Sequence, residues 1–436
     1  MPRLFIVDPN LKSLHGHYYG YAARVGLAAR ALGVEPTILA SIEAAVPYAD
    51  PPVCRVFSND YWHEMCPAAT TDPYVHLETS AQRFAAELAA ALSVCGATAE
   101  DAVFLPYANL VELDGVGRLA EQFGPALPRL SFLFRRDVDE QGIDARVGPR
   151  TIGALLRRAL ATLRVHPAHS QVRVFTDSDA LTDDYADHLQ YRVQTAPIPV
   201  DALFTALAVP RPSAPVVIGY FGDARLEKGY QHFPRLATLL SPALDAGAVR
   251  MVLQSNFNVP GGEAGIAPAR EALVNRPGVT VLDRPLEDVE YAQHLGATHL
   301  VVLPYQADRY VARTSGIVAE AIHAGVPLVV PEGTWMSEQL RRHGAGVTFD
   351  PWQADGLECA VERAIDRLPE LLSRASDRRA AFVAFHNPER LARFVCGAEL
   401  LDKAAASRRG SGTALALCRG MDRAGVPAGA EPVISD

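Results

Sequence analysis

The chain has 436 residues, of which 49% are hydrophobic and 21% charged, and its formal net charge is -9 at pH 7. This composition is typical of a globular protein with two or three domains. The acidic balance argues against nucleic acid as a partner, because no basic excess is present to neutralise phosphates. No apolar run reaches the roughly 18 residues that a transmembrane helix needs, so we expect no transmembrane segment and leave peripheral membrane contact open. The N-terminus turns polar too early for a signal peptide. Six scattered cysteines without a C-x-x-C pair favour a cytoplasmic location.

Short apolar runs alternate with helical patterns through the first half of the chain. The run at residues 4–7 is too short for a stable helix and predicts a buried strand. Apolar residues then recur at helical spacing from Tyr18 to Leu32, and Gly33 ends the pattern. Residues 47–80 show no assignable pattern. Further strands are expected at residues 102–105, 130–134 and 172–176, with one after the first helix at 37–40. This alternation predicts a doubly wound, Rossmann-like domain over residues 1–208.

A proline cluster at residues 209–215 predicts a stiff linker to a second domain over residues 216–386. Beyond that domain, Asn387 and Pro388 are typical of a helix start, so we expect a C-terminal helix at 387–403. The Ala/Gly/Ser/Arg-rich residues 404–436 predict a disordered tail. Within the second domain the expected strands are 216–221, 250–254, 279–282, 299–304 and 327–330, and the expected helices are 227–240 and 316–324. The predicted fold class is α/β, with two Rossmann-like parallel-sheet domains facing a cleft.

The loop after the first strand of the second domain carries two cations. Ligands of open α/β sheets bind at the carboxyl ends of the strands, where this loop lies. Arg225 and Lys228 are three residues apart and would share one face of an incipient helix. Together with Gly222, which allows close backbone approach, they suit a diphosphate. The alternative is a solvated helix start with charged surface residues.

A second loop runs from Tyr305 into a helix that begins near Gly316. A hydroxyl residue and a glycine at a helix start offer N–H and O–H donors to an anion, aided by the helix dipole. Glu320 lies one turn further on, among small apolar residues, so its carboxylate needs hydrogen-bond donors such as ribose hydroxyls. The alternative is an ordinary N-cap with Glu320 paired to a nearby base.

These loops belong to an ordered set of motifs over residues 216–350. The set reads Gly219-Tyr220-Phe221-Gly222-x-x-Arg225-x-Glu227-Lys228-Gly229, then Leu303-Pro304-Tyr305, then Ser315-Gly316-x-x-x-Glu320-Ala321. It resembles the family 4 (group 1) glycosyltransferases. The resemblance implies a GT-B fold, a nucleoside-diphosphate-sugar donor, usual retention of the anomeric configuration, and no obligatory metal or cofactor.

The same resemblance implies roles for individual residues. Arg225 and Lys228 would bind the donor diphosphate, and Glu320 would hold the ribose. The phosphate-facing helix start would comprise Arg313, Thr314, Ser315 and Gly316, and Gly16 would lie over the donor. The position eight residues before Glu320 is Ala312, where the family usually has a glutamate that touches the donor sugar. That acid is therefore absent here or displaced onto Asp308.

The N-terminal domain is expected to bind an unidentified hydroxyl acceptor. Candidate residues around the acceptor are His17, Tyr18, Arg135 and Tyr305. No base, sugar or acceptor is identified by the sequence.

Alternative interpretations remain open. Asp137-Val138-Asp139 is a D-x-D, the metal-binding element of another glycosyltransferase fold. Such pairs also arise by chance in a chain with 50 acidic residues, and the second pair at residues 177–179 is an example. The histidine pairs at 15–17 and 166–169 lack a further ligand at recognisable spacing, so we expect no metal site. A catalytically degenerate, two-lobed module that binds a nucleotide-sugar or another small molecule is the non-enzymatic alternative.

Overall fold

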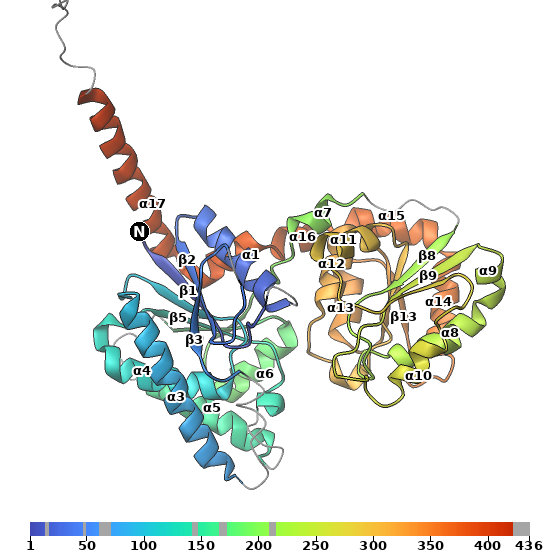
Figure 1. Cartoon of the computed structure of the whole chain (residues 1–436), viewed down its shortest axis with the longest axis horizontal. Coiled ribbons are helices and arrows are strands. Elements are labelled where there is room, and N and C mark those ends of the chain that lie inside the picture. Colours follow the sequence, from blue (N-terminus) through green and yellow to red (C-terminus); the bar gives the residue numbers. More distant parts are fainter. Residues whose placement is uncertain are drawn as a thin grey trace, which may run out of the picture.

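The computed structural model describes residues 1–13, 17–46, 49–60, 71–141, 147–164, 172–208 and 215–421. Two lobes, each built around a parallel sheet, lie side by side (Figure 1). No helix within these described ranges is long and apolar enough to cross a membrane.

The first lobe contains a seven-stranded sheet in the order β3-β2-β1-β4-β5-β6-β7. Its strands are β1 (Arg3–Asp8), β2 (Glu35–Ser41), β3 (Val53–Phe57), β4 (Ala102–Leu105), β5 (Arg129–Phe134), β6 (Val172–Thr176) and β7 (Val193–Thr195). Its helices are α1 (His17–Ala31), α3 (Pro73–Val94), α4 (Leu110–Phe123), α5 (Pro149–Arg164) and α6 (Asp179–Leu189), with the 3-10 turns η1 (Gly124–Ala126) and η2 (Val138–Gln141).

Alternation along the strands gives this sheet two buried faces. In β1, Phe5 and Val7 join a core covered by α3, α4, α5 and α6, whereas Leu4 and Ile6 join a core covered by α1 and the last helix of the chain. A strand buried on both faces reads as a continuous apolar run, which is why the sequence identified β1. Residues 47–80, which the sequence left unassigned, include β3 and the start of α3, where Asp72 accepts hydrogen bonds from two backbone N–H groups.

The second lobe has a six-stranded sheet in the order β10-β9-β8-β11-β12-β13. Its strands are β8 (Val216–Tyr220), β9 (Val249–Gln254), β10 (Val279–Leu282), β11 (Leu300–Val302), β12 (Leu328–Pro331) and β13 (Gly346–Phe349). Its helices are α7 (Ala202–Ala206), α8 (Phe233–Leu239), α9 (Ser241–Asp245), α10 (Ile266–Glu271), α11 (Asp288–Gly296), α12 (Gly316–Ala324), α13 (Trp335–His343), α14 (Gly356–Asp366), α15 (Leu368–Arg378) and α16 (Ala380–Phe385), with η4 (Tyr230–His232) and η5 (Ala307–Arg309). The predicted fold class is confirmed: both sheets reverse strand order beside their first strand, as doubly wound ligand-binding sheets do.

The chain enters the second lobe earlier than the proline cluster indicated. Ile198, Val200 and Phe204 already belong to the core of the second lobe. In α7, the Thr205 hydroxyl lies 2.9 Å from Nδ1 of His323 on α12. The crossing therefore lies near residues 196–201, and most of the expected linker, residues 209–214, lies outside the described residues.

The last helix returns the chain to the first lobe. Helix α17 (Pro388–Met421) buries Leu391, Val395 and Leu400 against α1 and the first sheet. The Ser131 hydroxyl of β5 donates to the Val395 carbonyl at 3.2 Å. Figure 1 shows α17 crossing from the junction of the lobes and running past the first lobe.

The C-terminal helix is longer than expected. Its backbone breaks at Gly397 (φ 69°) and then continues to Met421, so residues 404–421 are helical where the sequence analysis expected disorder. Alanine is the strongest helix former, and this segment is rich in it. Residues 422–436 lie outside the described part of the chain.

The return of α17 predicts that one apolar side chain on it stabilises the whole fold. Leu391→Ala should lower the free energy of unfolding by about 2–5 kcal/mol, because Leu391 is fully buried in the core that α17 shares with α1 and the first sheet. Asp402→Ala, an exposed change on the same helix, should cost less than about 0.5 kcal/mol. Urea denaturation of both variants measures the difference. Equal midpoints would show that α17 contributes no core.

Candidate functional site

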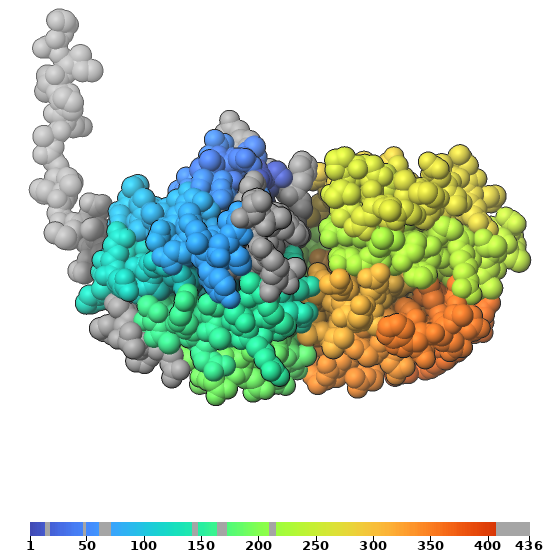
Figure 2. Space-filling view, turned by 90° about the horizontal axis from the view of Figure 1, so that it is seen from below, coloured from blue at the N-terminus to red at the C-terminus, as the bar shows by residue number. Residues whose placement is uncertain are grey.

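A cleft of about 990 Å³ lies between the lobes. Its walls come from residues that follow strand ends in both lobes: Tyr107 after β4, Arg135 after β5, Gly222 after β8 and Tyr305 after β11. Figure 2 shows the two lobes side by side, in contact near the middle of the molecule. The structure thus brings carboxyl ends of strands from both sheets to one cavity, where ligands of such sheets bind.

The predicted site residues converge on this cleft. Those that line it are Tyr18, Arg135, Gly222, Arg225, Lys228, Tyr305, Arg313, Thr314, Ser315, Gly316 and Glu320. Gly16 and the side chain of His17 lie outside the described residues.

The loop at residues 222–229 is not the helix start that the sequence predicted. Helical structure begins only at Tyr230 as η4, and α8 follows at Phe233. Gly229 explains the delay, since its backbone is left-handed (φ 71°) and a Cβ there would lie 1.8 Å from the Pro304 carbonyl oxygen. The loop therefore packs directly on the end of β11, and Arg225 and Lys228 are presented by a turn.

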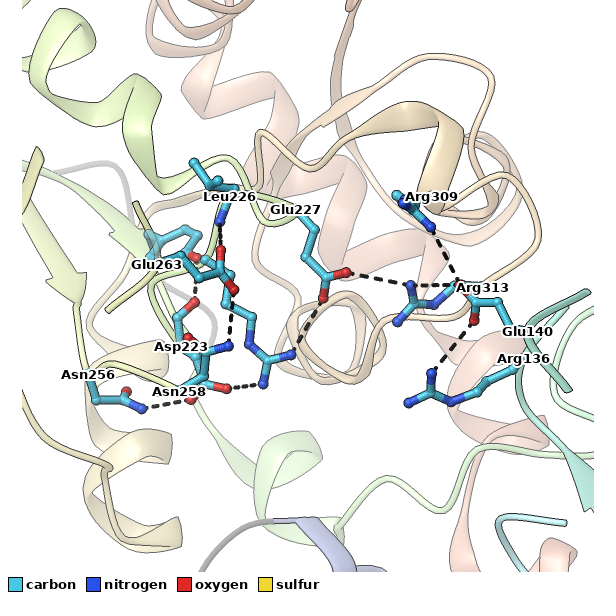
Figure 3. A network of polar contacts seen from close by, with 12 residues as sticks. Arg136, Glu140, Asp223, Leu226, Glu227, Asn256, Asn258, Glu263, Arg309 and Arg313 are labelled. Atoms are coloured by element: carbon cyan, nitrogen blue, oxygen red, sulfur yellow. Dashed lines mark hydrogen bonds and ion pairs between the residues drawn. The ribbon is translucent and has the colours of Figure 1, made fainter. Parts of the chain in front are cut away.

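Side chains from the end of β9 and from the segment that follows it hold this loop in place. Gln254, which ends β9, accepts a hydrogen bond from the Gly222 N–H at 2.8 Å. Asn256 donates to Asp223 at 2.7 Å, and Glu263 accepts from the Leu226 N–H at 2.7 Å. Figure 3 shows the contacts of Asp223 and Leu226 in this network.

Arg225 and Lys228 differ in their partners. Arg225 forms an ion pair with Asp223 and lies 3.5 Å from a carboxylate oxygen of Glu227. Lys228 is half-buried, and the described residues place no carboxylate within ion-pair distance of its Nζ. Burial lowers the pKa of Lys228, and the charge of Asp223 opposes that shift. Among the described residues, the ammonium group therefore lines the cleft without a partner of opposite charge. This is the state expected of a side chain that binds an anion.

Asp223 is the counter-charge of this loop. Burial acts to raise its pKa, but the charges of Lys228 and Arg225 and the Asn256 hydrogen bond outweigh burial, and the net shift is downward. The carboxylate therefore stays ionised at neutral pH, so Arg225 is already neutralised before any ligand arrives.

Arg313 joins the two lobes electrostatically. It lies 3.6 Å from Glu227 of its own lobe and 3.7 Å from Glu140 on η2 of the first lobe. Arg136 and Arg309 also face Glu140, at 3.8 and 3.9 Å (Figure 3). Arg313 therefore has partners in both lobes, and Glu140, which the sequence analysis did not single out, lies at the centre of the contact.

Thr314 is part of a second contact between the lobes. Its hydroxyl donates to Asp177 at 2.7 Å, and Nε of Arg135 donates to the same oxygen at 2.8 Å. Beside it, Ser178 donates to the Ala312 carbonyl at 2.7 Å. The position where the family resemblance would place a donor-sugar glutamate is thus docked on the first lobe.

The start of α12 opens onto the cleft. Ser315 caps the helix by accepting a hydrogen bond from the Val318 N–H at 3.5 Å. Next to it, a Cβ at Gly316 would meet no atom within 4 Å. The helix N-terminus therefore faces open space in which an anion could meet its dipole.

The hydrogen-bond partner of the Glu320 carboxylate is the tyrosine Tyr291, and not the basic side chain that the alternative interpretation expected. The Tyr291 hydroxyl donates to its carboxylate at 2.6 Å, and the Tyr291 ring packs edge-on against Phe221, with centroids 5.4 Å apart. Burial raises the pKa of Glu320 to about 7, although the Tyr291 hydrogen bond opposes the shift. Tyr291 carries no local sequence signal, because its partner is 29 residues away.

On the opposite wall, the guanidinium of Arg135 lies 5.1 Å and 5.0 Å from the ring centroids of Tyr21 and Tyr107. Tyr18 packs edge-on against Tyr107. Behind them Asp8 ends β1 almost fully buried, and burial raises its pKa to about 7. The acceptor candidates Tyr18 and Arg135 therefore belong to a cationic and aromatic surface on this wall.

The alternative metal sites find no support among the described residues, which contain no group of three or more side chains able to hold a metal ion. Asp137 and Asp139 do not line the cleft, and burial raises the pKa of Asp137 to about 6. Asp177 is committed to the contact between the lobes. His15, His166 and His169 lie outside the described ranges.

Comparison with solved structures defines the class of fold. The chain is similar to sucrose-phosphate synthase from Thermosynechococcus elongatus (15% identity, TM-score 0.60, covering 95% of this chain and 100% of that one). It is also similar to a glycosyltransferase from Rickettsia africae (11% identity, TM-score 0.65, 93% and 98%). A third neighbour is the α,α-trehalose 6-phosphate synthase from Burkholderia multivorans (14% identity, TM-score 0.63, 94% and 100%). No protein-family model and no curated protein sequence matches the chain. The fold is therefore that of the two-lobed GT-B glycosyltransferases.

The packing of Gly229 predicts a loss of the loop's geometry on substitution. Gly229→Ala places a Cβ against the Pro304 carbonyl, so the loop that carries Lys228 must move. Gly261→Ala is a matched control, because Gly261 has a similar left-handed backbone (φ 79°) with no atom near its Cβ position. The control should cost about 1–2 kcal/mol of stability from backbone strain. Gly229→Ala should cost about 1–3 kcal/mol more, because overpacking adds to the strain. Chemical denaturation compares the two, and an equal loss would contradict the close packing.

Proposed function

We propose that the protein is a glycosyltransferase that moves a sugar from a nucleoside-diphosphate-sugar to a hydroxyl acceptor. The observation that carries the proposal is the Lys228 ammonium, which has no carboxylate partner in the described part of the chain and lines the same cleft as the open start of α12. A cation and a helix N-terminus together form a diphosphate site. The GT-B fold and the ordered motifs of the second lobe support the same activity.

The mechanism follows from where charge develops. As the bond between the anomeric carbon and the diphosphate breaks, negative charge grows on the leaving oxygen. Lys228 and the N–H groups at the start of α12 stabilise that charge in the transition state. No metal is required in this proposal, because fixed positive groups neutralise the diphosphate.

The assignments are divided between the lobes. Arg225 orders the loop through Asp223, and Gly222 permits close approach of the donor. Glu320 holds the ribose hydroxyls. The acceptor hydroxyl enters from the wall that carries Tyr18 and Arg135. With retention of configuration, it attacks from the face that the diphosphate leaves, and a phosphate oxygen takes its proton.

The structural neighbours suggest the first substrates to try. One neighbour was solved with UDP-2-fluoro glucose bound, and another is a UDP-forming trehalose-phosphate synthase. UDP-glucose is therefore the first donor for assay, and sugar phosphates are the first acceptors. Membership of family 4 and a cytoplasmic location, expected from the motifs and the cysteine pattern, are parts of this proposal.

The second candidate is a binding module without catalysis. Ala312 favours it, because its carbonyl is docked on Ser178 and its side chain offers no acid to a donor sugar. Slow hydrolysis of the donor in the absence of acceptor separates the two: an enzyme shows it and a binding module does not.

Lys228 and Glu320 should affect different kinetic constants. Lys228 meets charge that grows in the transition state, so Lys228→Ala should lower kcat by about 100-fold or more. Glu320 holds the ribose equally in both states, so Glu320→Gln should mainly raise the donor KM. Steady-state kinetics with melting curves as the folding control decide this. A Lys228→Ala enzyme with unchanged kcat and donor KM would remove the diphosphate site from the proposal.

Donor binding should also depend on pH through Glu320. Its pKa is raised to about 7 in the free protein, so the carboxylate that accepts ribose hydrogen bonds becomes protonated as the pH falls through 7. Affinity for a nucleotide-sugar should therefore decrease as the pH falls below 7. The intact nucleotide-sugar is used because a free nucleoside diphosphate has a terminal phosphate that itself titrates at about pH 6.

Two variants identify the group responsible. Glu320→Gln should bind more weakly but without this pH dependence. Asp8→Asn should keep the dependence, although the pKa of Asp8 is also raised to about 7. Titration calorimetry from pH 5 to 9 measures all three proteins, and a pH dependence that survives in Glu320→Gln would contradict the ribose role.

A further inference from the structure

The cations in the cleft fall into two groups. Seven cations of the described residues line it, and five of them lie within 4.0 Å of a carboxylate: Arg135, Arg136, Arg225, Arg309 and Arg313. The other two, Arg24 and Lys228, face none among the described residues. Lys228 belongs to the second lobe and Arg24 to the first, so each lobe brings one unpaired positive charge to the cavity.

Arg24 is directed into the cleft by its place on α1. It lies one turn after Gly20, which also lines the cavity, and a Cβ at Gly20 would lie 3.3 Å from Nη1 of Arg24. Helical side chains lean towards the helix N-terminus, so the missing side chain at Gly20 leaves room for the guanidinium to lie over it. The Nε atom of Arg24 is buried and has no hydrogen-bond partner in the described structure.

Arg24 of the first lobe and Glu320 of the second lobe both line the cleft. The charge of Arg24 acts to lower the pKa of Glu320, against the larger effect of burial. The two side chains nevertheless form no ion pair within 4.0 Å. A gap between opposite charges from two lobes, inside a ligand cavity, is space that a ligand can fill.

A cation left with a buried, unsatisfied N–H group costs free energy that a bound anion recovers. Two anions could take this place, one on the donor and one on the acceptor. Glu320 and the start of α12 belong to the proposed donor site, and Arg24 lines the same cleft, where its charge acts on Glu320. The other cations of the first lobe, Arg135 and Arg136, are already paired with Asp177 and Glu140.

We infer that Arg24 binds the diphosphate of the nucleotide-sugar donor from the first lobe, opposite Lys228 of the second. The inference rests on the proposed function and extends it, because the first lobe then supplies a donor ligand as well as the acceptor wall. A donor held by a cation from each lobe bridges the cleft, so donor binding and the juxtaposition of the lobes become linked.

The test is the affinity for nucleoside diphosphates. UDP, GDP, ADP and TDP are titrated into the wild-type protein by calorimetry, and the tightest of them is used with the variants. Arg24→Gln should weaken its binding by about tenfold or more, as loss of a charge-assisted hydrogen bond does. Arg24→Lys keeps the charge and should recover part of the affinity. Arg150→Gln, which removes an exposed arginine of α5 outside the cleft, should leave it unchanged.

The nucleoside of the same base provides a second measurement. Arg24→Gln should leave the affinity for the nucleoside unchanged, because only the phosphates meet Arg24. Equal losses for nucleoside and nucleoside diphosphate would overturn the inference in favour of a structural role. A normal diphosphate affinity with a raised acceptor KM would overturn it in favour of the acceptor.

Lys228→Ala in the same titration separates this inference from the proposed function. Weak binding in Lys228→Ala with normal binding in Arg24→Gln and Arg24→Lys would refute the role of Arg24 and leave the donor site intact. If the wild-type protein binds none of the four diphosphates, both fail together.

Discussion

The burial of one helix of the second half of the chain against the first lobe determines how the rest of the molecule is arranged. Leu391, Val395 and Leu400 of α17 are fully buried among residues of α1 and β1, although the chain reaches them from α16 of the second lobe. The two lobes are therefore joined by two crossings, one near residues 196–201 and one near 386–388. Two connecting segments restrict the relative motion of the lobes more than one linker would. The two connections therefore keep the carboxyl ends of the strands of both sheets next to the same cavity.

Within that cavity, charge is distributed so that most cations are committed before a ligand arrives. Arg225, Arg309 and Arg313 are balanced by carboxylates on both lobes. These pairs order the loops at residues 222–229 and 305–316, which would otherwise lose conformational entropy on binding. The unpaired Lys228 and the open start of α12 are then held in position by neighbours that are already satisfied. Preorganised positive groups of this kind stabilise a leaving diphosphate without reorganising at the moment of reaction.

The contacts between the lobes involve the same loop that would bind the donor. Thr314 donates to Asp177, and the Ala312 carbonyl accepts from Ser178. The backbone and hydroxyl groups that the family resemblance assigns to the donor are thus partly occupied by the first lobe. Ser315 caps α12, which leaves Gly316 as the point of access. The phosphate-facing role therefore belongs to the N–H groups of the helix start more than to the hydroxyls beside them.

Much of the candidate site could be predicted from sequence because its signals are local. Arg225, Lys228 and Glu320 follow strand ends at recognisable spacing, and all three line the cleft. Their partners could not be predicted. Glu140 and Arg313 are far apart in the chain, and Tyr291 meets Glu320 only because α11 packs beside α12. Arg24 was missed because it looks like any exposed arginine on an amphipathic helix.

The sequence by itself determined most of the alternation of strands and helices, because a strand buried on both faces reads as a continuous apolar run and a helix shows a period of about 3.6 residues. It did not predict β3, β7 or β13. It also determined the two-lobed class, because each half contains a complete series of βα units. The tertiary structure decided where local preference met a distant constraint. The helix expected at residue 227 starts later because Gly229 packs on Pro304. The boundary falls before the proline cluster because Ile198 and Phe204 are buried in the second core. The return of α17 and the pairing of charges across the cleft depend on contacts between residues far apart in the chain, and such contacts leave no period in the sequence.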